Sequence, residues 1–314
     1  MIIMDRKNTL ILKELDLDAR QSNAQLARKV GLSKDAVKYR INKLEDKGII
    51  QGYYSIIDYY KLGFNISKIL IKFSNIGEKG EVAITNWLEN EPTVLWVAQT
   101  EGYWDIIYTI QAKKMSELIL FMETFKKQFP KTTSEIQLLL AQECTFLNEK
   151  HLYDKEDENK FEEIKIQSES IKIDARDEKI IKELEENSRA PLVAIADKLE
   201  ITPEAVLQRI KKLKKTGIIK RFKSRINFEA LGLEYNHIYL AIKDYSKLIE
   251  IEKYYKKMDY CTFIMKYQGN YHIHLEWVTK PGHLRKYLKE LKEKFGDYIA
   301  EYHAINIFKE FKML

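Results

Sequence analysis

The sequence has little cysteine and no long hydrophobic run, and both absences restrict the class of protein. Among 314 residues there are 2 cysteines, Cys144 and Cys261, which lack metal-ligand spacing and form no disulfide framework. No apolar stretch approaches the roughly 18 residues of a membrane-spanning helix, and the N-terminal segment lacks the apolar core of a signal peptide. We therefore expect a soluble, cytoplasmic protein with reduced thiols and no membrane partner.

Motifs for catalysis and cofactor binding are also missing. The sequence contains no glycine-rich phosphate loop, no nucleophile elbow and no pair of carboxylates in a catalytic context. His272 and His274 lie two residues apart and would share one face of a strand, but no third metal ligand stands at a suitable spacing. The sequence therefore predicts no enzyme, no cofactor and no bound metal.

An internal duplication is the most informative feature that is present. Residues 5–63 and 174–232 align without a gap at a constant offset of 169 residues. A repeat of about sixty residues is too long for a solenoid unit, so we expect one complete module present twice. Matching positions include Arg20 with Arg189, Arg40-Ile41 with Arg209-Ile210, Gly48-Ile49-Ile50 with Gly217-Ile218-Ile219, and Leu62-Gly63 with Leu231-Gly232.

Each copy begins with three helical patterns, which in the first copy end near residue 47. Gly31 suits the left-handed turn that ends the second helix, and Ser33 is placed to cap the third. In the second copy Glu200 replaces Gly31. Because a left-handed conformation costs a non-glycine residue on the order of 1 kcal/mol, this predicts a differently shaped turn. Residues 49–60, after the third helix, have the composition of a β-hairpin.

After each helical module the pattern becomes strand, helix, strand, strand, helix, strand, which is the order of a split βαβ sandwich. An acidic segment between the halves predicts a partly helical, solvated connector. The predicted fold class is therefore α+β, with two tandem units that each join a winged helix-turn-helix to a βαββαβ ferredoxin-like domain. The predicted boundaries are 1–62 and 63–150 for the first unit, 151–172 for the connector, and 173–231 and 232–314 for the second unit.

Two short helices joined by a tight turn, the second with a basic outward face, predict a helix-turn-helix whose second helix enters the major groove of DNA. Residues 203–225 carry nine basic side chains against one acid, a local charge that suits a polyanion, although the whole chain has a formal charge of only +6. The alternative is a solvated helix face. The candidate DNA-binding residues are Ser33, Lys34, Lys38, Tyr39, Arg40, Asn42 and Lys43, then Gln208, Arg209, Lys211 and Lys212, and on the wing Lys220, Arg221 and Lys223.

Several stretches of the first copy resemble the N-terminal domain of the leucine-responsive regulator (Lrp/AsnC) family. They are residues 20–27 (RQSNAQLA), 30–33 (VGLS) and 48–53 (GIIQGY). The βαββαβ segments resemble the ligand-sensing and oligomerising domain of that family. The resemblance implies double-stranded DNA as a partner, an intrachain pseudo-dimer formed by the two sensing domains, and further self-association into a homo-oligomer.

The same family marks the turn between the second and third sensing-domain strands with a Gly-Asp-Tyr-Asp type stretch, here 100–105 (TEGYWD) and 267–272 (YQGNYH). In such proteins this turn helps to bind an amino-acid effector, and a glycine turn exposes N–H groups that can hold a carboxylate. A plain hairpin turn is the alternative. His272 replaces the acid in the second copy. The candidate effector residues are Thr100, Gly102, Asp105 and Gly269.

The sequence thus predicts a sequence-specific DNA-binding transcription regulator with an amino-acid-like effector. The buried positions of the two reading helices match, but Lys38 and Tyr39 are replaced by Leu207 and Gln208, so the two DNA half-sites should differ. The main alternative is an enzyme that resembles sirohaem decarboxylases, which look like paired Lrp-type chains and use histidines in the sensing-domain cleft. The first half has no histidine before His151, which weakens this alternative. A small-molecule sensor that does not bind DNA is the third hypothesis.

Overall fold

The computed structural model describes residues 4–152, 161–167 and 169–313, and these form two compact units. Each unit takes segments from both halves of the sequence. The first, which we call the helical unit, contains residues 4–58, 147–152, 161–162 and 171–233. The second, which we call the barrel unit, contains residues 59–146, 163–167, 169–170 and 234–313. In this part of the chain no helix is both long enough and apolar enough to cross a membrane.

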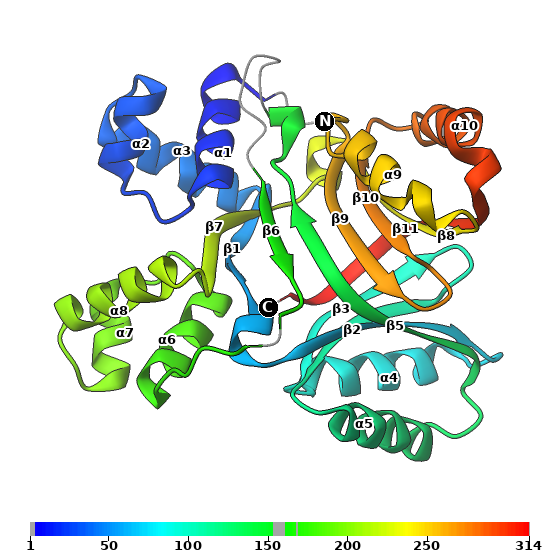
Figure 1. Ribbon diagram of the computed structural model, residues 1–314. Helices are drawn as coiled ribbons and strands as arrows, with labels where there is room; N and C mark the ends of the chain where they lie inside the picture. Colours follow the sequence, from blue (N-terminus) through cyan, green and yellow to red (C-terminus); the bar gives the residue numbers. More distant parts are fainter. Residues whose placement is uncertain (1–3, 153–160, 168, 314) are drawn as a thin grey trace. The chain divides into compact units, whose positions relative to one another are not determined.

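In the helical unit each copy of the repeat supplies three helices followed by one strand (Figure 1). Apolar side chains from all three helices of the first copy form a single core, to which Leu152 and Ile226 also contribute. The elements of the first copy are α1 (Arg6–Leu17), α2 (Asn23–Val30), α3 (Lys34–Asp46) and β1 (Ile50–Ile57); those of the second are α6 (Ala175–Glu186), α7 (Leu192–Leu199), α8 (Pro203–Lys215) and β7 (Ile219–Ile226).

The turns of the two helix-turn-helix motifs have the same backbone conformation. Gly31 has φ 64° and ψ 52°, and Glu200 has φ 54° and ψ 46°, so both are left-handed. The expectation of a differently shaped second turn is therefore wrong. In both copies the next N–H donates back into the helix, at 3.0 Å for Leu32 and 3.2 Å for Ile201. This shared hydrogen bond and the packing of the two helices hold Glu200 in a conformation that glycine adopts with less strain.

The strand that follows the third helix pairs with its counterpart from the other copy. β1 and β7 form a two-stranded antiparallel sheet in which Tyr54 lies opposite Lys223. These two positions differ by the repeat offset, so a local two-fold axis passes between them. The hairpin expected for residues 49–60 is wrong, because β1 runs unbroken through them as far as Ile57. β7 forms the backbone hydrogen bonds with β1 that a second strand of a hairpin would otherwise form.

Two equivalent arginines link the copies across this axis. Arg20 donates a hydrogen bond from Nη1 to the carbonyl oxygen of Ser188, and Arg189 donates one from Nη1 to that of Ala19, both at 2.6 Å. Each guanidinium also lies over an aromatic ring of the other copy's strand, at 5.9 and 5.1 Å from the ring centroid. A side chain that the repeat carries at the same position in both halves therefore makes the same contact twice.

Lys223, next to the axis, is buried in the helical unit beside two acidic side chains. Its Nζ lies 2.8 Å from Asp16 Oδ1 and 3.3 Å from Glu149 Oε1, and it donates to the carbonyl oxygen of Leu147. Lys223 is 2% exposed and Asp16 is fully buried. Burial works against the ammonium, but the two carboxylates outweigh it and raise the pKa of Lys223. The pair thus joins β7 of the second copy to α1 of the first.

The barrel unit is built from the two βαββαβ segments (Figure 1). The first contains β2 (Asn65–Phe73), α4 (Glu78–Asn90), β3 (Val94–Glu101), β4 (Ile106–Ala112), α5 (Met115–Gln128) and β5 (Thr133–Phe146), and the short β6 (Glu162–Lys165) is added beside β5. The second contains β8 (Glu234–Ile242), α9 (Leu248–Tyr255), β9 (Cys261–Gln268), β10 (Ile273–Thr279), α10 (Leu284–Phe295) and β11 (Ile299–Met313).

Eight of these strands close into a ring in the order β2-β4-β3-β11-β8-β10-β9-β5, and β5 returns to β2. The fourth strand of each copy pairs with the second strand of the other, as β11 with β3 and β5 with β9. Ile69 and Ile71 pack with α4 and α5. Because side chains alternate along a strand, Lys68 points to the opposite face, into the ring. The ring closure leaves β2, β3 and β5 without an unpaired edge.

We expect replacement of Lys223 by methionine to lower the free energy of unfolding by about 3–5 kcal/mol, because Asp16 would then remain buried without its counter-charge. Urea unfolding of the full chain, followed by circular dichroism, measures this change. Lys215→Met removes an exposed lysine from the same unit and serves as the control, with an expected change within about 0.5 kcal/mol. Equal stability of the two variants would contradict a supporting role for the buried pair.

Candidate functional site

The outward face of α3 is polar and accessible. Lys34, Lys38, Asn42 and Lys43 are exposed, and Tyr39 is 66% exposed with Lys43 Nζ 5.8 Å from its ring centroid. Val37, Ile41 and Leu44, on the opposite face, are buried in the core of the helical unit. The helix begins at Ser33, whose hydroxyl accepts a hydrogen bond from the Ala36 N–H. This arrangement leaves a face of charged and amide groups free to meet a ligand.

The corresponding face of α8 has a different composition. Gln208, Lys211 and Lys212 are exposed, and Lys212 Nζ lies 3.6 Å from Asp177 Oδ2. Thr202 caps the helix through Ala205 N–H, as Ser33 does in the first copy. The two helices therefore begin in the same way but present different side chains.

Arg40 and Arg209, two of the candidate DNA-binding residues, bind the N-cap of the first helix of their own copy. Arg40 Nη1 lies 2.6 Å from Asp5 Oδ2, and Arg209 Nη1 lies 2.8 Å from Asp174 Oδ2. Asp5 and Asp174 are the N-caps of α1 and α6. The sequence contained a signal for this role, because both members of each pair recur at the repeat offset. These contacts favour a structural role over a DNA contact.

The wing residues also differ from the expectation. Arg221 is 6% exposed, and its Nη1 donates to Asn148 Oδ1 at 2.7 Å while its Nη2 lies 3.3 Å from Glu162 Oε1. Lys223 is enclosed as described above, and Lys220 Nζ lies 3.8 Å from Asp58 Oδ2. Their burial and these ion pairs therefore disfavour DNA contacts by Arg221 and Lys223. Their charge is neutralised by acids that lie far away in the sequence.

Two of the candidate effector residues line a cleft of about 580 Å³ in the barrel unit. Thr100 and Asp105 share this cleft with residues of α4 and with Lys309 of β11. The cleft therefore combines hydroxyl and amide groups with four carboxylates, those of Glu78, Glu81, Glu101 and Asp105, and one ammonium. This acidic excess suits a small ligand that carries an amino group.

The two turn glycines are packed against the other copy. A Cβ on Gly102, at φ 142°, would lie 3.3 Å from the carbonyl oxygen of Ala304 in β11. A Cβ on Gly269, at φ 145°, would lie 2.8 Å from Leu139 Cδ2 and 3.0 Å from the carbonyl oxygen of Leu138 in β5. Glycine is thus needed at both turns for close packing, which favours the plain-turn alternative for Gly269.

Asp105 also has a local backbone role. Its Oδ2 accepts a hydrogen bond from the Phe73 N–H at 2.6 Å. In the second copy His272 does the same, since its Nδ1 accepts from the Ile242 N–H at 2.8 Å, and burial lowers the pKa of that imidazole. The acid and the histidine therefore replace one another as acceptors at the end of the first strand. Only the acid adds a negative charge.

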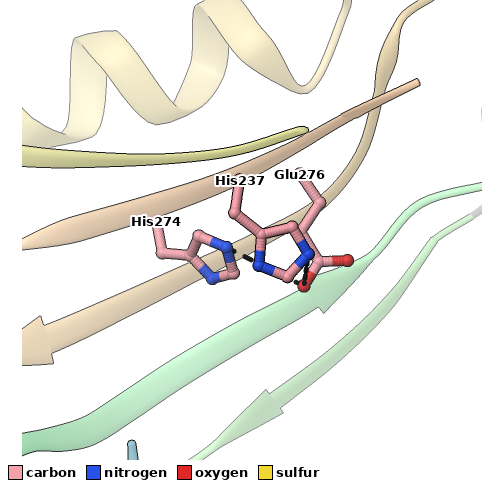
Figure 2. A group of neighbouring side chains, drawn as sticks. All are labelled: His237, His274 and Glu276. Atoms are coloured by element: carbon pink, nitrogen blue, oxygen red, sulfur yellow. Dashed lines mark ion pairs between the residues drawn. The ribbon is translucent and has the colours of Figure 1, made fainter. Parts of the chain in front are cut away.

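A polar cluster inside the barrel was not foreseen from the sequence. His237 of β8 lies opposite Glu276 of β10, and His274 lies two residues before that glutamate on the same face (Figure 2). The Nε2 atoms of His237 and His274 lie 3.8 and 3.9 Å from Glu276 Oε1. Both histidines are fully buried, and their ring nitrogens make no hydrogen bond within the described structure. Tyr235 donates its hydroxyl proton to Glu276 Oε2.

Aromatic rings and one lysine surround this cluster. The His237 ring stacks on Trp96 at 5.6 Å and the His274 ring stacks on Tyr239 at 4.4 Å. Burial, and then the nearby Lys68 ammonium, hold the pKa of His237 well below its usual range. Burial in turn lowers the pKa of Lys68 to about 8, against the opposing effect of nearby carboxylates. Burial also holds the pKa of His274 well below its usual range, so both imidazoles are neutral at physiological pH.

Sequence reasoning paired His274 with the wrong histidine. His272 precedes β10 and bonds to the backbone of β8, whereas the true neighbour, His237, is 37 positions away from His274 along the chain. The useful signal was the order of strands: in a split βαβ sandwich the first and third strands are adjacent. Alternate residues of those strands, here His237 and Glu276, then face the same side.

Comparison with known proteins gives consistent results for both halves. A family profile described as winged helix-turn-helix DNA-binding matches residues 4–51 and again residues 173–220. The HTH-type transcriptional regulator Ptr1 of Methanocaldococcus jannaschii is 31% identical over 123 residues, which cover 38% of this chain and 80% of that protein. The HTH-type transcriptional regulator LrpA of Pyrococcus horikoshii is 40% identical over 67 residues, which cover 21% of this chain and 48% of that protein.

Among solved structures, the crystal structure of the siroheme decarboxylase NirDL matches with a TM-score of 0.65 and 16% identity. The match covers 98% of this chain and 93% of that one, so the two share a fold over nearly their full lengths. Both halves of the present chain consist of a winged helix-turn-helix followed by a β-rich segment, and their relatives are regulators of one type. The chain therefore belongs to the leucine-responsive regulator (Lrp/AsnC) family and carries two units of that family in tandem.

Proposed function

We propose that this protein is a cytoplasmic transcription regulator that binds double-stranded DNA in a sequence-specific manner through α3 and α8. The observation that carries the proposal is the exposed polar face on each of these helices, each within a winged helix-turn-helix match. The pairing of β1 with β7 holds the two modules as an intrachain pseudo-dimer. Named relatives are HTH-type transcriptional regulators, which supports the same conclusion.

Base readout is assigned to outward positions whose side chains are exposed and, among the described residues, form no ion pair within their own copy. On α3 these are Lys34, Lys38 and Asn42, and on α8 they are Gln208 and Lys211. Gln208 suits paired hydrogen bonds to adenine, whereas a lysine suits guanine. Because the two sets differ, the preferred site combines two unlike half-sites. Tyr39, Lys43 and Lys212 flank these positions and suit contacts with the sugar-phosphate backbone.

We assign effector binding to the cleft beside Thr100 and Asp105 in the barrel unit. One oxygen of Asp105 is used by the Phe73 N–H, and a carboxylate has capacity for further donors. An α-amino group suits the Asp105 side of the cleft, and an α-carboxylate suits the Lys309 side. The proposed effector is therefore an amino acid or a similar small zwitterion. Self-association of chains through their barrel units would extend the pseudo-dimer to a homo-oligomer.

The second candidate function is tetrapyrrole chemistry of the sirohaem decarboxylase type. It is favoured by the fold shared with NirDL over nearly the whole chain. Against it, His237 and His274 are fully buried, so a tetrapyrrole would have to open the barrel to reach either imidazole. Since both relatives named above are regulators, we place regulation first.

The bound DNA sequence is the sharpest test of the regulator proposal. We expect selection from a random duplex pool to recover a non-palindromic site. Lys34→Ala with Lys38→Ala should relax one half of it, and Gln208→Ala with Lys211→Ala the other, since each lost base contact costs about 1–3 kcal/mol of discrimination. Lys126→Ala with Lys127→Ala removes the same charge from α5 and should change neither half. A perfect palindrome that depends only on the first pair would mean that two chains pair and only the first copy reads DNA.

The effector cleft is tested by Asp105→Asn, which keeps the acceptor for the Phe73 N–H but removes the charge. We expect one amino acid to raise the melting temperature of the wild-type chain, by the equivalent of about 2.7 kcal/mol at one hundred times its dissociation constant. The variant should lose this ligand-induced rise while its melting temperature without ligand stays unchanged. Absence of any stabilising amino acid, or an undiminished rise in the variant, would remove the assignment.

The enzyme alternative is tested by visible absorption of the full chain mixed with an iron tetrapyrrole. We expect the spectrum of the free tetrapyrrole, because the buried imidazoles are not accessible as axial ligands. A shifted absorption band that disappears in His274→Ala, but persists in His303→Ala, would instead favour tetrapyrrole chemistry in the barrel.

A further inference from the structure

We propose that His237, His274 and Glu276 form a binding site for one divalent transition-metal ion in the interior of the barrel unit. The three side chains offer two imidazole nitrogens and one carboxylate oxygen, all within 4.8 Å of one another (Figure 2). This donor set suits ions such as Zn²⁺, Fe²⁺ and Co²⁺, which accept nitrogen ligands, rather than Mg²⁺ or Ca²⁺.

The distances between the donors are close to those of a bound site. Ions of this class bind nitrogen and oxygen at about 2.0–2.2 Å, so tetrahedral ligands lie about 3.4 Å apart. The Nε2 atoms of His237 and His274 lie 3.8 and 3.9 Å from Glu276 Oε1. Side-chain rotations of a few tenths of an ångström would bring each imidazole to ligand distance from the carboxylate, and the two imidazole donors already lie within 4.8 Å of each other.

The hydrogen bonding of the two histidines also indicates a missing ligand. Neither ring nitrogen of His237 or His274 has a hydrogen-bond partner in the part of the chain that the structure describes, although both side chains are fully buried. A buried polar group without a partner costs about 1–3 kcal/mol, and two such rings lie side by side, 4.6 Å apart. One metal ion would bind one nitrogen of each imidazole ring.

The groups around the triad support a bound cation. Tyr235 donates to Glu276 Oε2 and leaves Oε1 directed at the histidines, which is the usual arrangement around a ligating carboxylate. Lys68 adds one positive charge nearby, but both Glu276 and Glu310 oppose it. Two carboxylates against one ammonium leave the region negative before the ion enters.

A second cluster of carboxylates in the barrel unit is paired with lysines. Glu143, Glu163 and Glu252 also lie close enough to share an ion. Lys266, however, lies 2.8 Å from both Glu143 and Glu252, and Lys256 lies 2.7 Å from Glu163. Ammonium groups therefore already supply the positive charge there.

The duplication fixes the stoichiometry. Lys68 lies opposite Thr109 on β2 and β4, as His237 lies opposite Glu276 on β8 and β10. The first-copy equivalents of the triad are therefore Lys68, Ile107 and Thr109, which offer no comparable donor set. The site exists once in each chain, despite the two-fold repetition of the fold.

The test uses the full chain, unfolded with a chelator and refolded with or without Co²⁺, because the site is buried and metal binding is coupled to folding. After gel filtration, elemental mass spectrometry should find one cobalt per chain, with the d–d absorption of nitrogen and oxygen ligation. Zn²⁺ should displace the cobalt and raise the melting temperature above that of the metal-free chain.

The variants assign the ion to its ligands. His274→Gln should weaken Co²⁺ binding more than about 100-fold, and Tyr235→Phe, which leaves all three ligands in place, about 10–100-fold. His303→Gln alters a histidine outside the triad and should bind Co²⁺ as the wild type does. If His274→Gln does not fold, Tyr235→Phe against His303→Gln decides the outcome.

Three results would overturn the proposal. They are absence of cobalt from the refolded wild type, two ions per chain, and equal losses in the triad and His303 variants.

Discussion

Backbone pairing between the two copies of the repeat is the interaction on which the rest of the structure depends. It occurs at β1 with β7, at β3 with β11 and at β5 with β9, so both the helical unit and the barrel unit draw on both halves. Each copy alone would present three unpaired strand edges, which are sites of aggregation. Fusion in one chain keeps the partner edge at a high effective concentration. The sequence repeat is therefore a structural requirement as well as an evolutionary record, because each copy completes the other.

Within this frame, residues that recur at the repeat offset support the fold in the same way in both copies. Arg20 and Arg189 make the same cross-copy contact, and Arg40 and Arg209 both bind the N-cap of their own first helix. By contrast, Lys223 is opposed by Tyr54 across the local axis and takes its counter-charges from α1 and the segment after β5. The buried lysine therefore has its carboxylate partners on one side of the axis only. In a symmetric pair of chains, the two residues that face each other at this point would be identical.

Periodicity, caps and turns predicted most of the elements from the sequence, because these signals are local. The helices of the first copy end at Asp46, where the sequence predicted an end near residue 47, and both copies then follow the predicted order of strands and helices. Charge was less informative. Residues 203–225 contain nine basic side chains. The sequence does not reveal that the acids at 16, 149 and 162 form ion pairs with two of them. The hairpin, the wing contacts and the histidine cluster were misjudged or missed for one reason: each depends on which strand lies beside which, and that is a property of the closed sheets.

The barrel interior shows what fusion permits that a symmetric dimer does not. Lys68 and His237 occupy equivalent positions in the two copies, and both lie against Trp96. The centroid of the Trp96 ring is 4.2 Å from Lys68 Nζ and 5.6 Å from the centroid of the His237 ring. In a dimer of identical chains both positions would carry lysine, or both histidine. Two buried ammonium groups would repel each other and destabilise the charged state of both. A single ammonium opposed by Glu276 and Glu310 avoids this repulsion and leaves the other position free for an imidazole. Once the copies share a chain, each can change alone. The interior can then hold one asymmetric polar cluster, while the exposed faces of α3 and α8 diverge in their side chains.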